Sequence, residues 1–167
     1  MNTRDEMLAG VRLVSFDIDG VFTDGRIYLS DDGTESKSFH TQDGFGVRRL
    51  LEAGLAVAVI SGRQSTAVEK RMSELGVPHV MQGNSDKVAA FEALAGKLGI
   101  DQSQALYVGD DVPDLPLLRR VGFSVAVSNA HADVKAACDY TTVNAGGFGA
   151  VREVCDLVLQ ARQRAEG

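Results

Sequence analysis

The sequence predicts an α/β protein with a three-layer, doubly wound (Rossmann-like), mostly parallel sheet. Two observations predict this class. Short runs rich in Val, Leu and Ala, with no polar alternation, recur at 12–17, 55–61, 105–110 and 123–127; this is the pattern of parallel strands that are covered on both faces. Amphipathic helical segments lie between these runs, and strands that alternate with helices form right-handed βαβ units.

The expected helices are recognised by the spacing of their apolar residues and by the glycines that follow them. A glycine after the last periodic residue ends a helix because it adopts the left-handed conformation without strain. Ser85 is the expected N-cap of one helix, since a serine hydroxyl accepts a backbone N–H there. The three segments are 46–54, 65–76 and 85–99.

One segment departs from the alternation of strand and helix. Residues 25–40 alternate polar and apolar side chains around Asp31, Asp32 and Gly33, which predicts a protruding β-hairpin with these three residues in the turn. The hairpin is too short to form a cap domain. Because no repeat or linker is found, we expect a single domain over 1–167 that carries the hairpin as an insertion.

Composition excludes several classes of function. The chain has 167 residues, 44% of them hydrophobic and 24% charged, and a net charge of −6. A nucleic-acid or anionic-membrane binder would need a basic face, and no apolar run is long enough to span a bilayer. The first ten residues lack the apolar centre of a signal peptide. We therefore expect a cytoplasmic protein with no nucleic-acid or membrane partner.

Polar side chains collect where the predicted strands end, which is the ligand-binding edge of an open parallel sheet. Clustered carboxylates repel one another and need a cation; hard oxygen ligands suit Mg²⁺. Ser61, Lys87 and glycine N–H groups are donors for phosphate oxygens. These strand-end residues are Asp17, Asp19 and Gly20; Ser61, Gly62 and Arg63; Lys87; and Asp110, Asp111 and Asp114.

The pair Asp17 and Asp19 has a specific chemical meaning in such a site. An aspartate beside Mg²⁺ and phosphate can attack phosphorus and form an aspartyl phosphate. A second aspartate two residues on can protonate the leaving alkoxide and later activate water. The sequence thus predicts Mg²⁺-dependent phosphoryl transfer.

The same residues carry a family resemblance. Their order and spacing resemble the four motifs of the haloacid dehalogenase superfamily, over essentially the whole chain, and the hairpin in place of a cap is similar to its capless branch. The motifs are DIDGVFTDG at 17–25, Ser61-Gly62, Lys87 and GDDVPD at 109–114. Further segments resemble the 3-deoxy-D-manno-octulosonate 8-phosphate phosphatases, which act in lipopolysaccharide precursor synthesis. These are FHTQDGFG (39–46), ISGR (60–63), QGNSDK (82–87) and GGFGAVREVCDLVL (146–159).

The resemblance implies a role for each matching residue. Asp17 would be the nucleophile and Asp19 the acid/base. Mg²⁺ would be held by Asp17, the backbone carbonyl of Asp19 and Asp110. The phosphate would be bound by Ser61 and Lys87, and Lys87 would also steady the nucleophile. Asp19, Gly20 and Gly62 would contribute to the same phosphate-binding site.

The resemblance also implies contacts around the centre. Arg63 and the Asp43-Gly44 turn would meet the sugar acid. Asp111 and Asp114 would lie near the metal, with Asp114 orienting Lys87 or a water on the metal. The chain departs from the family pattern at three positions, to which we assign no role: His40, Gln42 and Phe148.

Quaternary structure and substrate follow from the resemblance as expectations too. The family is tetrameric, with the hairpins meeting at the centre and a neighbour closing each site, so we expect a homotetramer that binds a sugar acid phosphate. A phosphatase of a nine-carbon, sialic-acid-like sugar 9-phosphate is the nearest alternative. A phosphomutase generally carries a cap, and a phospho-aspartate signalling module places its aspartate after a later strand; both remain as alternatives from other classes.

Overall fold

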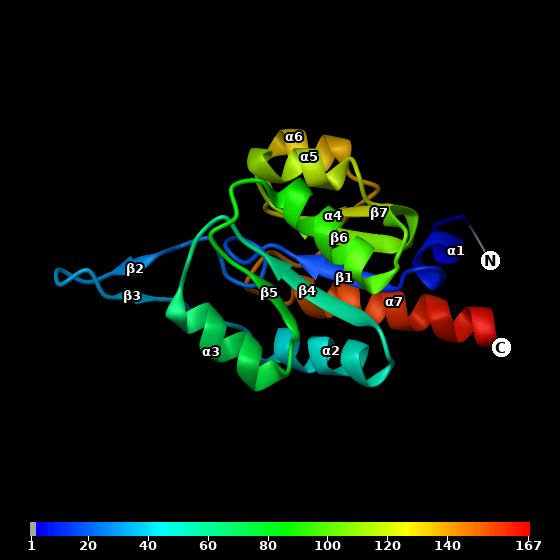
Figure 1. Ribbon diagram of the computed structural model, residues 1–167, viewed down its shortest axis with the longest axis horizontal. Helices are drawn as coiled ribbons and strands as arrows, with labels where there is room; N and C mark the ends of the chain where they lie inside the picture. The colour runs from blue at the N-terminus through cyan, green and yellow to red at the C-terminus, as the bar shows by residue number, and fades with distance from the viewer. Residues whose placement is uncertain (1–2) are drawn as a thin grey trace.

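A computed structural model, which describes residues 3–167, shows a three-layer α/β domain (Figure 1). All neighbouring strands of its six-stranded sheet are parallel, in the order β5-β4-β1-β6-β7-β8. The expected fold class is confirmed. The strands are β1 (Leu13–Phe16), β4 (Ala56–Ile60), β5 (His79–Met81), β6 (Ala105–Gly109), β7 (Phe123–Ala126) and β8 (Tyr140–Thr141).

The central strand β1 pairs with β4 on one side and with β6 on the other. Every residue of β1, β6 and β7 is buried, which explains why these segments are apolar without alternation. All four long apolar runs are strands. The short strands β5 and β8 carry too few apolar residues to be recognised by such runs.

Helices cover both faces of the sheet. Figure 1 shows α2 and α7 below the sheet, and α4, α5 and α6 above it. This is the arrangement that right-handed crossovers produce when the chain first builds one half of the sheet and then the other. The helices are α1 (Thr3–Ala9), α2 (Thr41–Glu52), α3 (Thr66–Leu75), α4 (Lys87–Leu98), α5 (Leu115–Leu118), α6 (Ala132–Ala137) and α7 (Ala150–Glu166), with short 3₁₀ turns η1 (Gln102–Gln104) and η2 (Val112–Asp114). None of the helices in the described part of the chain is long and apolar enough to cross a membrane.

The predicted helix ends are partly correct. Gly76 and Gly99 follow α3 and α4 in the left-handed conformation, with φ of 77° and 63°, as expected. The N-cap of α4 is Asp86 and not Ser85, because the Asp86 carboxylate accepts the backbone N–H of Ala89. Asp86 directly precedes Lys87, the first residue of α4, and the residue in this position is the one whose side chain can accept a first-turn N–H.

The first predicted helix begins earlier than expected. α2 starts at Thr41, with His40 as its N-cap, whose Nδ1 accepts the backbone N–H of Gln42. Asp43 and Gly44 therefore lie in a helix, and the predicted turn at these two residues is wrong. The first turns of this helix were not predicted because they contain Gly44 and Gly46, and glycine has low helix propensity.

The hairpin is confirmed. β2 (Tyr28–Leu29) and β3 (Glu35–Ser36) pair antiparallel, with Leu29 opposite Glu35. Gly33 in the turn has a φ of +85°, which glycine adopts without strain. Figure 1 shows that the hairpin extends away from the body of the domain.

Candidate active site

The predicted strand-end residues meet at a single cavity. The carboxyl ends of β1, β4 and β6 surround a volume of about 350 Å³, which lies within the usual range for small-ligand pockets. Nine of the predicted site residues line it: Asp17, Asp19, Ser61, Gly62, Arg63, Lys87, Asp110, Asp111 and Asp114. Gly20, Asp43 and Gly44 do not. Gly25, Ile27 and Pro113 complete the lining.

Asp17 is the residue that follows β1, and its side chain is held at two points. Its Oδ1 accepts the backbone N–H of Ile18 at 2.7 Å and lies 3.1 Å from Nζ of Lys87. The residue is 8% exposed. One carboxylate of the site is thus fixed at the floor of the cavity, with a cation beside it.

Lys87, the first residue of α4, is surrounded by acids. Its Nζ donates to Oδ1 of Asp114 at 2.8 Å, in addition to its contact with Asp17. Burial alone would lower the pKa of Lys87, but the carboxylates of Asp17 and Asp114 raise it above its usual value. Lys87 therefore stays a cation, as a phosphate-binding residue requires.

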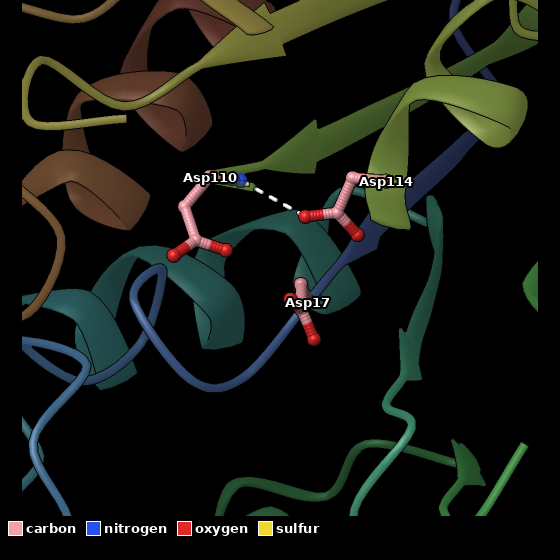
Figure 2. A group of neighbouring side chains, drawn as sticks. All are labelled: Asp17, Asp110 and Asp114. Atoms are coloured by element: carbon pink, nitrogen blue, oxygen red, sulfur yellow. Dashed lines mark hydrogen bonds between the residues drawn. The ribbon is translucent and has the colours of Figure 1, made fainter. Parts of the chain in front are cut away.

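Asp114 organises its neighbours. Its Oδ1 accepts from Lys87 and, at 2.7 Å, from the hydroxyl of Tyr107. Its Oδ2 accepts the backbone N–H groups of Asp110 and Asp111 at 3.0 and 3.3 Å, the first of which is drawn in Figure 2. Both oxygens are thus engaged by donors. The contact between Asp114 and Lys87 is the one predicted, whereas Tyr107, inside strand β6, was missed because nothing in an apolar strand marks one buried hydroxyl as part of the site.

Three carboxylates converge on the cavity (Figure 2). Asp17, Asp110 and Asp114 each offer an oxygen within 4.8 Å of the others. Burial and the neighbouring acids raise the pKa of Asp17 to about 7 and that of Asp110 to about 8. Because one lysine does not neutralise three acids, a cation would relieve this repulsion. The donor set therefore fits Mg²⁺, with Asp17 and Asp110 as its carboxylate ligands, since Asp114 already accepts from four donors.

Gly20 does not line the cavity, and its contact with phosphate stays a prediction. Its N–H donates to Oγ1 of Thr23, so this donor is already engaged. Its φ is +86°, and a Cβ at this position would overlap the carboxylate of Asp110. A Cβ at Gly146 would likewise overlap the carbonyl oxygen of Gly20. Both glycines allow close packing of the loop that follows β1.

Ser61 and Arg63 come from the loop after β4. The Ser61 N–H donates to the carbonyl of Met81 at 2.8 Å, and its Oγ accepts the Arg63 N–H at 3.3 Å. Ser61 is buried at the cavity wall, while the Arg63 side chain is 50% exposed. The two residues thus present a fixed hydroxyl and a solvent-accessible guanidinium to the same space.

Asp19 meets a residue that sequence reasoning missed. Its Oδ1 accepts from Nζ of Lys37, which lies one residue beyond β3 at the base of the hairpin, and its Oδ2 lies 3.9 Å from Nε of Arg63. Glu35 also contacts both cations. The only available sequence signal was the charged content of the hairpin, which is equally typical of a solvent-exposed strand.

Asp43 and Gly44 were predicted to contact the sugar, but they lie outside the cavity. The Asp43 carboxylate is buried against α7, where its Oδ1 accepts the backbone N–H of Arg152 at 3.0 Å. A Cβ at Gly44 would overlap the guanidinium of Arg71 on α3. The two residues join α2 to its neighbouring helices.

Comparison with known proteins first defines the class. A family model described as haloacid dehalogenase-like hydrolase matches residues 73–153. The 3-deoxy-D-manno-octulosonate 8-phosphate phosphatase of Escherichia coli strain K12 is 46% identical over 156 residues, which cover 93% of this chain and 83% of that protein.

Solved structures agree with this class. The phosphatase of that name from Moraxella catarrhalis, crystallised with a magnesium ion, a phosphate ion and a KDO molecule, has a TM-score of 0.95 and 42% identity, covering 99% of this chain and 95% of its own. A cobalt-bound form from Haemophilus influenzae has a TM-score of 0.91 and 38% identity, covering 95% and 93%. The chain belongs to the haloacid dehalogenase-like hydrolases, in the family of the 3-deoxy-D-manno-octulosonate 8-phosphate phosphatases.

Proposed function

We propose that this protein is a Mg²⁺-dependent phosphatase that hydrolyses 3-deoxy-D-manno-octulosonate 8-phosphate to the free sugar acid and phosphate. The observation that carries the proposal is the convergence of Asp17, Asp19, Lys87 and Asp110 on one cavity. Family membership, at 46% identity over 93% of the chain, supports this substrate and places the reaction in lipopolysaccharide precursor synthesis.

The nucleophile in this proposal is Asp17. Its carboxylate attacks phosphorus, the bond between phosphorus and the sugar oxygen breaks, and an aspartyl phosphate remains. Lys87, which lies beside Asp17, and Ser61 hold the phosphoryl oxygens. Bound Mg²⁺, held by the carboxylates of Asp17 and Asp110 and the backbone carbonyl of Asp19, would neutralise these acids and polarise the phosphoryl group.

Asp19 moves the protons. In the first step it donates a proton to the departing sugar oxygen, which leaves as an alcohol. In the second step it accepts a proton from the water that attacks the aspartyl phosphate, and inorganic phosphate is released. Its place at the cavity wall, on the side of Arg63 and the hairpin, suits a group that works on the leaving oxygen.

Recognition of the sugar acid falls to Arg63. Its guanidinium is half exposed and lines the cavity, so it can pair with a substrate carboxylate. Asp111, which also lines the cavity and follows Asp110 directly, supports the metal site without a ligand role. A nine-carbon sugar 9-phosphate, phosphoryl return to a sugar, and a signalling role are less favoured, because the relatives matched over most of the chain are octulosonate phosphatases.

We also propose a cytoplasmic homotetramer of single-domain subunits, over residues 1–167, in which the hairpins of 25–40 pair. Ile27, Tyr28 and Leu29 are 41%, 52% and 69% exposed. An isolated two-stranded hairpin is marginal in water, and its free edges invite pairing. Closed symmetric assembly would cover these side chains and place a neighbour at each cavity.

Steady-state assays test the proposed activity. Purified protein with Mg²⁺ is given a panel of eight- and nine-carbon sugar acid phosphates, and phosphate release is ranked by kcat/KM. The eight-carbon 8-phosphate is expected to rank first. A higher value for a nine-carbon 9-phosphate would replace the substrate, isomerised sugar phosphate would indicate a mutase, and a single stoichiometric phosphorylation without turnover would indicate a signalling module.

A further inference from the structure

A buried lysine contacts the carboxylate of Asp19, the proposed acid/base. The side chain of Lys37 is 1% exposed, and its Nζ donates to Oδ1 of Asp19. The same Nζ lies 3.3 Å from Oε1 of Glu35. An ammonium removed from water is costly unless acidic partners compensate it, and here two carboxylates do so.

Lys37 does not reach the substrate space. Asp19 and Arg63 line the cavity, whereas Lys37 does not. Its ammonium contacts Oδ1 of Asp19, whereas Arg63 lies nearer to Oδ2. Lys37 would therefore act on the reaction through its contacts, which are Asp19 directly and Arg63 by way of Glu35.

Within the described part of the chain, no second cation makes a comparable contact with Asp19. The Nε of Arg63 lies 3.9 Å from Oδ2 of Asp19, which is beyond hydrogen-bond distance. The Nη2 of Arg63 instead donates to Oε2 of Glu35 at 2.7 Å. Glu35 thus contacts both cations. Among residues 3–167, Lys37 alone makes a hydrogen bond to the Asp19 side chain.

We infer that Lys37 is a positioning residue that holds the carboxylate of Asp19 in the orientation needed for proton transfer, with Glu35 fixing Lys37 in turn. This inference rests on the proposed phosphatase function. It connects the first catalytic loop to the end of the hairpin, since Lys37 follows β3 directly. The placement of the hairpin, and not only the loop after β1, then determines how Asp19 meets the leaving oxygen.

A double-mutant cycle tests the inference. Lys37→Met keeps the length of the side chain and removes the cation; Asp19→Asn removes the proton-transferring group. General acid–base catalysis contributes about 10²–10⁴-fold, and a displaced catalytic group costs about 10²-fold. We expect Lys37→Met to lower kcat about tenfold to 10²-fold with KM changed less than twofold. In the Asp19→Asn background, Lys37→Met should have almost no further effect, because residues that act as a unit are not additive.

A leaving-group experiment distinguishes positioning from general damage. The p-nitrophenolate ion leaves without a proton, so phosphorylation of Asp17 by p-nitrophenyl phosphate does not need Asp19, whereas hydrolysis of the aspartyl phosphate does. Lys37→Met and Asp19→Asn should therefore both show a stoichiometric burst of p-nitrophenolate before slow turnover. Loss of the burst along with turnover would overturn the inference.

The controls address charge and folding. Lys70→Met removes an exposed lysine of α3 and should leave kcat unchanged. Lys37→Gln, which keeps a donor, should retain more activity than Lys37→Met, and thermal melting monitors the fold of each variant. If the wild-type protein turns over but the losses in the cycle are fully additive, the role of Lys37 is overturned while the proposed function stands. A wild-type protein that releases no phosphate from any sugar acid phosphate would overturn the proposed function itself.

Discussion

The ammonium of Lys87 lies 3.1 Å from Oδ1 of Asp17. This pair joins the start of α4 to the end of β1, on neighbouring sides of one cavity. The cation offsets the charge of the Asp17 carboxylate. Its three N–H donors face oxygens of Asp17, Asp114 and Tyr107, so a bound phosphate would share these donors with them. In the proposed mechanism, this pair is where phosphate binding and nucleophilic attack would take place.

Replacement of the proposed nucleophile should abolish turnover. In Asp17→Asn the amide does not attack phosphorus and is a poor Mg²⁺ ligand, so we expect phosphate release to fall below a few per cent of the wild-type rate. Circular dichroism should show an intact fold. Substantial remaining turnover would move the nucleophile to another residue. Asp24→Asn, which changes an acid outside the cavity lining, is the matched control and should keep its activity.

Phosphate release should depend on a divalent metal ion, with Mg²⁺ as the activating ion. EDTA should abolish phosphate release and Mg²⁺ should restore it, because the clustered acids and the substrate both need the cation. Ca²⁺ should inhibit, since it is larger and less demanding of octahedral geometry. Unchanged turnover in excess chelator would remove the metal from the mechanism.

The stability of the metal-free protein should fall as the pH rises. Burial and neighbouring acids raise the pKa of Asp17 to about 7 and of Asp110 to about 8, from an ordinary value of 3.8. Between about pH 4 and 8 these two residues therefore bind more protons in the folded protein than in the unfolded chain, and their contribution to the free energy of unfolding decreases with pH. Denaturant unfolding in EDTA at pH 5.5 and 8 measures this, and Asp110→Asn should reduce the slope.

Binding of Mg²⁺ should show the opposite pH dependence. Because the ligands must be deprotonated, affinity rises with pH. The increase in melting temperature on addition of Mg²⁺ should be larger at pH 8 than at pH 5.5. An increase that is equal at both values would show that these acids are ionised throughout the range.

Disruption of the hairpin surface should dissociate the proposed tetramer. Tyr28→Asp and Leu29→Asp place charges on side chains that are 52% and 69% exposed in the single chain. Light scattering should detect smaller species, and kcat/KM should fall much more for the sugar acid phosphate than for p-nitrophenyl phosphate. Val143→Asp, at another exposed apolar residue, is the control. A wild-type monomer with full activity would contradict the proposal.

Local pattern was sufficient for much of this molecule. The runs that became β1, β4, β6 and β7 are apolar because the sheet is covered on both faces, and a doubly wound sheet brings the residues after its strands to one edge. Asp17, Ser61, Lys87 and Asp110 could therefore be assigned to one site before any coordinates. Their positions follow from chain order and sheet topology alone.

Only the tertiary structure decided the partners of these residues. Lys37 reaches Asp19 because the hairpin returns to the cavity, and Tyr107 reaches Asp114 across the end of β6. A glycine is required at position 20 because Asp110 approaches it closely. Asp43 lies in α2 and accepts a backbone N–H of α7. Each depends on the direction in which a side chain points across the fold, which the periodicity of a single segment does not encode. The sequence by itself determined which elements carry the chemistry, and the packing of those elements decided which side chains touch.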